Sequence, residues 1–284
     1  MIKLIASDMD GTLLNNNHVI SEENIKAIRE AQKRGIDFAI ATGRDYADVE
    51  PFLKQYNLKC ESIVSNGAEY RDVDGNIIES IDIDKALVEK VFNIMDKYGL
   101  KAELFTSDGI YTPNSREEAL KGTIYMLSTF LKISTEEAEK LAKKDEKFKR
   151  LKYIENLYEF LNGPIEVKKI FAFYSDVDLV NKAKAEIQKI SGLAVSSSFV
   201  SNIEITNENA QKGLILAKVA KKMGIKKDEV MIMGDSFNDY SMFTEFTETV
   251  AMENAIPEIK KIAKYITDTN ENNGVAKAIR KILK

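Results

Sequence analysis

Two aspartates close to the N-terminus, Asp8 and Asp10, are separated by one methionine in the segment Asp8-Met9-Asp10-Gly11-Thr12. A carboxylate in the first position can attack phosphorus and form an aspartyl-phosphate. A carboxyl group two residues further on can protonate the leaving oxygen and later activate water. Gly11 and Thr12 allow a tight turn whose amides can face phosphoryl oxygens. We therefore interpret Asp8 as a nucleophile and Asp10 as its acid/base partner.

A second acidic segment, residues 234–239, adds Asp235 and Asp239 to this pair. Four carboxylates at close quarters repel one another unless a cation lies among them. They are hard oxygen ligands, and no His or Cys accompanies them, which favours Mg²⁺ as the ion. A magnesium ion held by few carboxylates usually engages a substrate phosphate as well. The metal and the nucleophile therefore indicate the same phosphoryl chemistry.

Short and nearly all-apolar runs precede the polar groups. Residues 2–7, 36–41 and 229–233 are such runs, and they are typical of strands buried on both faces of a parallel sheet. Ligands of open parallel sheets bind beyond the carboxyl ends of the strands. We therefore expect the three segments that follow these strands to converge on one crevice.

Further residues near the strand ends complete the expected phosphate site. Thr42 offers a hydroxyl and Gly43 an unobstructed amide after the second strand. Phosphoryl transfer also requires a cation that neutralises the transferring group, and Lys212 is the best-placed lysine because it begins a predicted helix. Arg44 is open to two interpretations, a phosphate ligand or one partner of a structural ion pair. His18, the sole histidine, lies in a loop near the site, where solvation is favoured over substrate contact.

The pattern of predicted elements divides the chain into two parts. Residues 1–83 and 207–284 alternate helices with buried-type strands, which predicts an α/β fold with a doubly wound, Rossmann-like parallel sheet. Residues 84–206 mix helices with hairpin-like strands, which predicts a separate α+β domain inserted into the first. Helices are expected at 21–34, 46–56, 84–98, 115–130, 135–147, 177–190, 210–223, from Pro257, and at 275–283. Further strands are expected near 63–65, 101–106, 110–113, 150–155, 165–174, 193–206 and 249–252.

Composition excludes several classes of partner. The 284 residues carry a net charge of -4 with acidic and basic residues interleaved, unlike the clustered basic face of a nucleic-acid-binding protein. No run approaches the ~20 apolar residues of a membrane span. Cys60 is the sole cysteine, so no internal disulfide is possible and a reducing, cytoplasmic compartment is expected. We expect no nucleic-acid, membrane or obligate protein partner.

These motifs resemble those of the haloacid dehalogenase-like hydrolase superfamily. The long insertion and the segment 65–68, Ser-Asn-Gly-Ala, resemble the Cof-type subfamily in particular. Asp-Met-Asp-Gly-Thr at 8–12 is similar to the first family motif (DxDGT), Thr-Gly-Arg at 42–44 to the second, Lys-Gly at 212–213 to the third, and Gly-Asp-Ser-Phe-Asn-Asp at 234–239 to the fourth (GDxxND).

The resemblance implies a fold, an activity and a set of residue roles. It implies a Mg²⁺-dependent phosphatase of small phosphorylated metabolites, such as sugar phosphates, with residues 84–206 as a type IIB α/β cap. The nucleophile Asp8 would bind the metal too, Asp10 would bind it through its main-chain carbonyl, and Asp235 would be the remaining protein ligand, supported by Asp239. The phosphoryl group would be held by the Met9 amide, Thr42, Gly43, Lys212 and Asn238.

Two other functions remain open at this stage. A phosphotransferase or mutase would share the aspartyl-phosphate step and differ only in the acceptor. A phospho-accepting signalling module would share the acidic Mg²⁺ pocket on a doubly wound sheet. Two features disfavour the signalling module. Asp10 would speed turnover of the aspartyl-phosphate, and the long insertion is foreign to such modules.

Overall fold

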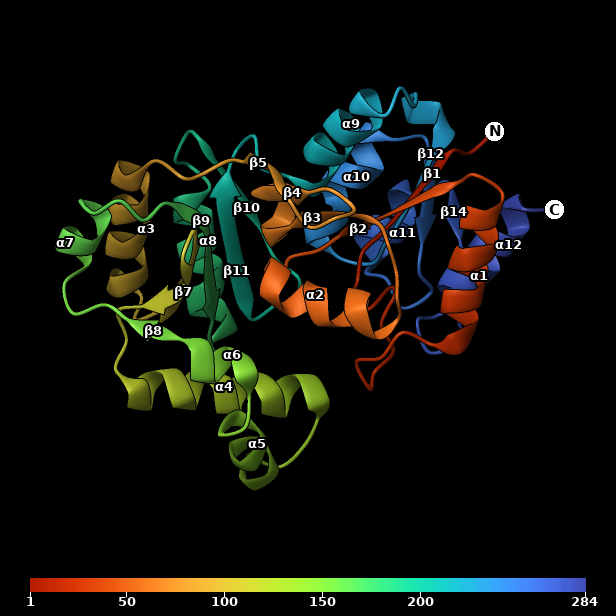
Figure 1. Cartoon of the computed structure of the whole chain (residues 1–284). Coiled ribbons are helices and arrows are strands. Elements are labelled where there is room, and N and C mark those ends of the chain that lie inside the picture. The colour runs from red at the N-terminus through yellow and green to blue at the C-terminus, as the bar shows by residue number, and fades with distance from the viewer. The chain divides into compact units, whose positions relative to one another are not determined.

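The computed structural model describes residues 1–284, and the chain forms two compact units (Figure 1). The first, which we call the core unit, comprises Met1–Ser80 and Ala210–Lys284. The second, the inserted unit, comprises Ile81–Asn209. Each has its own sheet. None of the helices is both long and apolar enough to span a membrane.

An eight-stranded sheet organises the core unit, in the order β14-β13-β12-β1-β2-β3-β4-β5. Strands β14 to β3 are all parallel, and at one edge β4 runs in the opposite direction, so that it pairs antiparallel with both β3 and β5. The elements of this unit are β1 (Leu4–Ser7), α1 (Glu22–Lys33), β2 (Asp37–Ala41), α2 (Tyr46–Gln55), β3 (Glu61–Val64), the 3₁₀ turn η1 (Ser65–Gly67), β4 (Glu69–Arg71), β5 (Ile77–Ser80), α9 (Lys212–Lys222), η2 (Lys227–Glu229), β12 (Val230–Gly234), η3 (Phe237–Asp239), α10 (Tyr240–Glu245), β13 (Glu248–Ala251), α11 (Pro257–Ile262), β14 (Tyr265–Ile266) and α12 (Gly274–Ile282).

Strand β1 lies between β12 and β2 and is parallel to both. In this register Ser7, the last residue of β1, is level with Met233 and Ile40. All four residues of β1 are buried, as are those of β12, because helices cover a parallel sheet on both faces. The expectation that the ends of these three strands meet at one edge of the sheet is therefore confirmed.

The first helix illustrates how local sequence sets these boundaries. Ser21 caps α1 by accepting a hydrogen bond from the Asn24 amide, and Ile25 and Ile28 face the core. Helix α1 packs against α12, and α9 packs against α10. Figure 1 shows these two pairs on opposite sides of β1 and β12, which is the doubly wound arrangement.

The inserted unit contains a six-stranded, mostly antiparallel sheet in the order β10-β11-β9-β6-β7-β8. Helices α3 and α8 pack through Val91 and Ala183 in one core with Ile170 and Ile203 of the sheet. The elements are α3 (Lys85–Lys97), β6 (Ala102–Thr106), β7 (Gly109–Thr112), α4 (Arg116–Leu131), α5 (Thr135–Ala142), α6 (Glu146–Arg150), β8 (Lys152–Tyr153), α7 (Leu157–Leu161), β9 (Val167–Phe173), α8 (Val177–Ile187), β10 (Leu193–Ser196) and β11 (Asn202–Asn207).

One expected helix is divided in the structure. The segment 135–147 is helical only to Ala142, and a second helix begins at Glu146. Asp145 causes the break, because its side chain accepts a hydrogen bond from the Phe148 amide and thereby caps the second helix. The single helix expected at 135–147 was therefore wrong. Helix α7 and strand β14 are both very short, and neither was expected.

Candidate active site

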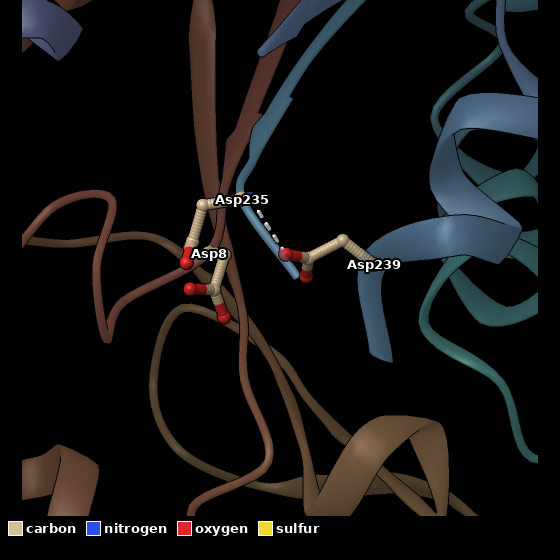
Figure 2. A group of neighbouring side chains, drawn as sticks. All are labelled: Asp8, Asp235 and Asp239. Atoms are coloured by element: carbon tan, nitrogen blue, oxygen red, sulfur yellow. Dashed lines mark hydrogen bonds between the residues drawn. The ribbon is translucent and has the colours of Figure 1, made fainter. Parts of the chain in front are cut away.

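Three aspartates meet at the carboxyl edge of the core sheet. Asp8 follows β1, Asp235 follows β12 and Asp239 lies in η3. One carboxylate oxygen from each residue lies within 4.8 Å of the others. Figure 2 shows Asp8 and Asp235 next to each other, with Asp239 facing them from the adjoining turn. Asp8 and Asp239 are buried, so the cluster is part of the protein interior and is not a solvated acidic loop.

Two glycines make the close approach of these carboxylates possible. A Cβ atom on Gly11 would lie 2.5 Å from Oδ2 of Asp235, and a Cβ on Gly234 would lie 2.7 Å from Cγ of Asp239. Gly11 also has a φ of +80°, a backbone conformation that residues with a side chain adopt only at a cost. Glycine is therefore required at these positions of the first and fourth motifs, because a side chain there would collide with Asp235 or Asp239.

Lys212 is the cation of this cluster. Its Nζ lies 2.6 Å from Oδ1 of Asp8 and 2.7 Å from Oδ1 of Asp239, and its side chain is 0% exposed. Helix α9 begins at this residue, and Gly213 allows it to pack tightly, since a Cβ there would lie 2.1 Å from the backbone oxygen of Ser241 in α10. The packing of α9 against α10 thus fixes the ammonium group between two carboxylates.

The remaining bonds of the cluster orient the carboxylates. The Thr12 hydroxyl donates to Oδ1 of Asp235 over 2.7 Å. Oδ2 of Asp239 accepts the backbone amides of Asp235 and Ser236 at 2.9 and 3.0 Å. Asp239 therefore accepts from three donors, counting Lys212, whereas the side chains of Asp8 and Asp235 accept from one each and retain more free acceptor capacity.

Burial and mutual repulsion disturb the titration of the cluster. Burial, joined by the charges of Asp239 and Asp235, raises the pKa of Asp8 well above its usual range against the opposing effect of Lys212. Burial and the charge of Asp239 raise the pKa of Asp235 to about 8, although the Thr12 hydrogen bond opposes the shift. Burial alone would lower the pKa of Lys212, but Asp239 and Asp8 outweigh it and raise the pKa.

These shifts indicate that one lysine does not balance the charge of three carboxylates. A divalent cation beside Asp8 and Asp235 would supply the missing positive charge. The donor set is all oxygen, with neither histidine nor cysteine among the clustered residues, and this suits a hard cation such as Mg²⁺. The residues present therefore fit the expected metal, with Asp8 and Asp235 as the side chains best able to hold it.

The side chain of Asp10 is not part of this cluster. It pairs with Arg44, whose Nε donates to Oδ2 over 2.8 Å and whose Nη2 donates to Oδ1 over 2.6 Å. Nδ1 of His18 lies 3.9 Å from the same Oδ1. Burial would raise the pKa of Asp10, but the hydrogen bonds and charge of Arg44 outweigh it and hold the pKa below its ordinary value. Of the two interpretations of Arg44, the ion pair is the one that the structure contains.

The residues expected to hold phosphate lie around the same edge. Thr42 is buried, and its Oγ1 accepts the Arg44 amide over 3.2 Å. Gly43 lies between these two residues, in the segment that follows β2. Met9 is fully buried, and its carbonyl accepts the Thr12 and Leu14 amides. Asn238 lies in η3, and its Nδ2 is 3.3 Å from Oδ1 of Asn66.

Asn66 is a site residue that the sequence pattern did not assign. Ser65 and Asn66 have φ values of +51° and +59°, and Gly67 follows at +99°. Two consecutive non-glycine residues in the left-handed region are a local strain that persists only where the surroundings enforce it. The Asn66 amide donates to the carbonyl of Thr42 over 2.9 Å. The Ser-Asn-Gly sequence was the available signal, but an Asn-Gly pair is first interpreted as a hairpin turn.

A buried carboxylate cluster with one buried lysine, at the carboxyl edge of a doubly wound sheet, is suited to phosphoryl chemistry through an aspartate nucleophile. The chain belongs to the haloacid dehalogenase-like hydrolases, whose family model matches residues 5–279. The expected superfamily, the fold class and the enzyme class are thereby confirmed.

The sole cysteine, Cys60, is not part of the site. It is buried, and burial raises the pKa of its thiol to about 12, which makes it a poor nucleophile.

Several known proteins are similar to this chain over almost its whole length. The 5-amino-6-(5-phospho-D-ribitylamino)uracil phosphatase YcsE of Bacillus subtilis is 33% identical, covering 98% of this chain and 95% of that protein. A haloacid dehalogenase-like hydrolase from B. subtilis has a solved structure with 31% identity and a TM-score of 0.87, covering 98% of this chain and 99% of that one. The subclass IIB sugar phosphatase BT4131 shares the fold, with a TM-score of 0.80 at 23% identity, over 99% and 98% of the two chains.

Proposed function

We propose that this protein hydrolyses phosphate monoesters of small metabolites through an aspartyl-phosphate on Asp8. The observation that carries the proposal is the contact of Asp8 with Lys212, because both side chains are buried at the end of β1. A buried carboxylate in contact with a lysine remains ionised once enough positive charge surrounds it, and it is shielded from bulk water until substrate arrives. It is therefore suited to attack phosphorus.

The proposed reaction has two halves. A carboxylate oxygen of Asp8 attacks the phosphorus atom, the ester bond breaks, and Asp10 passes a proton to the leaving oxygen. Because Arg44 favours the ionised form of Asp10 in the free protein, Asp10 would first take this proton from the monoanionic phosphate of the substrate. Asp10, now a carboxylate, then takes a proton from water, which attacks the phosphorus and releases inorganic phosphate from Asp8. Lys212, Thr42, Gly43, Asn238 and the Met9 amide would hold the phosphoryl oxygens.

A magnesium ion would be held by Asp8 and Asp235 and by the main-chain carbonyl of Asp10. Asp239 would support these ligands. When bound, it would neutralise charge on the phosphoryl group and orient it for in-line attack. Thr12 would support this role, since its hydroxyl fixes one oxygen of Asp235. Gly11 and Gly234 leave the space that these ligands need.

We propose small phosphorylated metabolites, such as sugar phosphates, as substrates, with the inserted unit acting as a cap. Its expected bounds, 84–206, lie inside the observed unit Ile81–Asn209. YcsE is named for a phosphorylated ribityl compound, which is a sugar-like phosphate monoester and supports this substrate class. A cap that closes over the substrate would exclude bulk water and contribute selectivity.

The experiment that tests this function is a phosphate-release screen over phosphorylated sugars, polyols and nucleotides, compared by kcat/KM. Multiple turnovers in the presence of Mg²⁺, absent from the Asp8→Asn variant, are expected. Transfer of the phosphoryl group to a second sugar without phosphate release would favour the phosphotransferase. A single phosphorylation event without turnover would favour the signalling module and contradict the proposal.

A further inference from the structure

Arg44 and Asp10 form a two-point ion pair at the edge of the site. The guanidinium donates through Nε and Nη2 to the two oxygens of one carboxylate, at 2.8 and 2.6 Å. Such paired hydrogen bonds fix the plane and direction of a carboxylate as well as its distance. Asp10 is still 42% exposed, so the pair lies at the open side of the site, where a leaving group would depart.

Arg44 is itself held at three places. Its backbone amide donates to Oγ1 of Thr42, and its carbonyl accepts the Ser65 amide over 2.7 Å. Its guanidinium carbon lies 5.4 Å from the ring centroid of Phe52 in α2, a distance at which cation–π attraction operates. The arginine is therefore a fixed support, because the ends of β2 and β3 and helix α2 all contribute to its position.

We infer that Arg44 is a positioning residue that acts on the leaving group through Asp10. The inference rests on the proposed function, in which Asp10 transfers the proton. A carboxyl group donates a proton efficiently only along a suitable direction and at hydrogen-bond distance. The guanidinium sets that direction before substrate binds, and it keeps the Asp10 side chain away from Asp235 and Asp239.

The competing role for Arg44 is direct binding of phosphate. The edge of the guanidinium formed by Nε and Nη2, one of its two edges capable of two-point recognition, is occupied by Asp10. A phosphate ligand would act equally on all phosphate esters. A residue acting through the acid would act only where the leaving oxygen needs a proton, and this difference can be measured.

The test compares two substrates of different leaving-group basicity. 4-Nitrophenyl phosphate leaves as a stabilised phenolate and needs little protonation, whereas glycerol 2-phosphate leaves as an alkoxide unless it is protonated. Because kcat/KM reports the steps up to release of the leaving group, water activation does not enter. We expect Arg44→Gln to lower kcat/KM for glycerol 2-phosphate about 10- to 100-fold more than for 4-nitrophenyl phosphate, which is less than the full contribution of a general acid because Asp10 itself remains.

A double-mutant cycle separates action through Asp10 from independent action. In an Asp10→Asn background, adding Arg44→Gln should change kcat/KM for glycerol 2-phosphate less than twofold, because the group being positioned is already lost. Arg44→Lys keeps the charge without the two-point geometry, so partial recovery is expected. Arg71→Gln is the matched control. It breaks another ion pair of the core unit, with Glu69 at 2.5 Å, and should leave the ratio between the substrates unchanged.

Each outcome decides the inference. Equal losses on both substrates, or independent losses in the cycle, would identify Arg44 as a phosphate ligand and overturn the positioning role. No loss of kcat/KM on either substrate in Arg44→Gln would reduce the pair to a structural contact. If Arg44→Gln does not fold, Arg44→Lys is judged by the same ratio. Failure of the parent protein to hydrolyse either ester would refute the proposed function instead, so the two failures are distinguishable.

Discussion

The ammonium group of Lys212 lies 2.6 Å from Oδ1 of Asp8, and neither side chain has appreciable contact with solvent. The first residue of α9 thereby meets the first residue after β1. Because the lysine also contacts Asp239, one cation links the proposed nucleophile to the turn that follows β12. Removing this cation leaves two buried carboxylates uncompensated, which is costly.

We expect Lys212→Met to lower kcat/KM for any phosphate ester at least ~100-fold, since a preorganised cation at the transferring group is lost. Steady-state phosphate release measures the effect. Lys218→Met is the control, because Lys218 lies on the same helix and pairs with Glu79 at 2.5 Å, but half of its side chain is exposed. Similar losses in both variants would show that the effect comes from the helix and not from the site.

Asp8→Asn should abolish turnover while leaving the fold intact. Asparagine has nearly the same shape but is a very poor nucleophile, and it removes a carboxylate whose pKa is already raised by burial and its acidic neighbours. We therefore expect an unchanged or higher melting temperature without metal, by circular dichroism, together with loss of phosphate release. A variant that keeps more than about a tenth of the parent activity would contradict the role of Asp8.

Removal of divalent cations should silence the enzyme reversibly. Two of the three clustered carboxylates retain free acceptor capacity, and the lysine balances only part of their charge. Treatment with a chelator followed by desalting is expected to reduce phosphate release to background, and added Mg²⁺ to restore it. Undiminished turnover in the chelated protein would exclude a metal from the reaction.

The stability of the metal-free protein should fall as pH rises. The pKa of Asp235 is raised to about 8 in the folded protein, whereas an unfolded aspartate titrates near ~3.9. Between these values the folded state binds more protons than the unfolded state, so the free energy of unfolding decreases with rising pH. Asp8, whose pKa is also raised, contributes in the same direction.

Melting temperatures at pH 5.5 and pH 8.5 check this prediction. We expect the metal-free protein to melt several degrees lower at pH 8.5, a smaller difference in Asp235→Asn, and a larger stabilisation by Mg²⁺ at the higher pH, where the ligands are ionised. Equal pH dependence in the parent and in Asp235→Asn would rule out Asp235 as its source.

Gly67→Ala should damage activity through Lys212. A Cβ atom on Gly67 would lie 2.7 Å from the backbone carbon of Gln211, the residue before Lys212. Gly35→Ala is the matched control, since its φ of +78° carries a similar backbone cost with no atom within 4 Å. We expect Gly35→Ala to lose about 1–2 kcal/mol of stability and keep its activity. Gly67→Ala should lose more stability than Gly35→Ala, and its kcat/KM should fall at least ~10-fold. If both variants keep the same activity, Gly67 does not act through Lys212.

Much of the core unit follows from local sequence, because buried parallel strands must be nearly all apolar. The run before Asp8 and the run before Asp235 are therefore visible as strands, and their shared edge follows from the parallel topology. The burial of Lys212 could not be predicted in this way. A lysine at the start of a helix resembles a surface residue, and it is the packing of α9 against α10, η1, β3 and η3 that removes it from water.

Side-chain partners were the least predictable part of the site. Arg44 has a long side chain that can reach either phosphate or a carboxylate, so the residue type alone does not select Asp10. Asn66 illustrates a different limit, because its left-handed backbone results from contacts with Thr42 and Asn238 that lie far away in sequence. The break at Asp145 depends on a competition between two conformations, one with a capped second helix and one with a continuous helix, and their free energies differ by little.

The position of β1 between β2 and β12 has a consequence for the synthesis of the protein. Leu4 pairs with Val230, so the central strand leaves the ribosome long before one of its two neighbours. Domains generally fold as units, the earlier ones first. The inserted unit is a continuous segment and is complete when Asn209 emerges. It can therefore fold while the core sheet is still unfinished, and Asp8 lacks its partner Lys212 until the segment after the inserted unit has emerged.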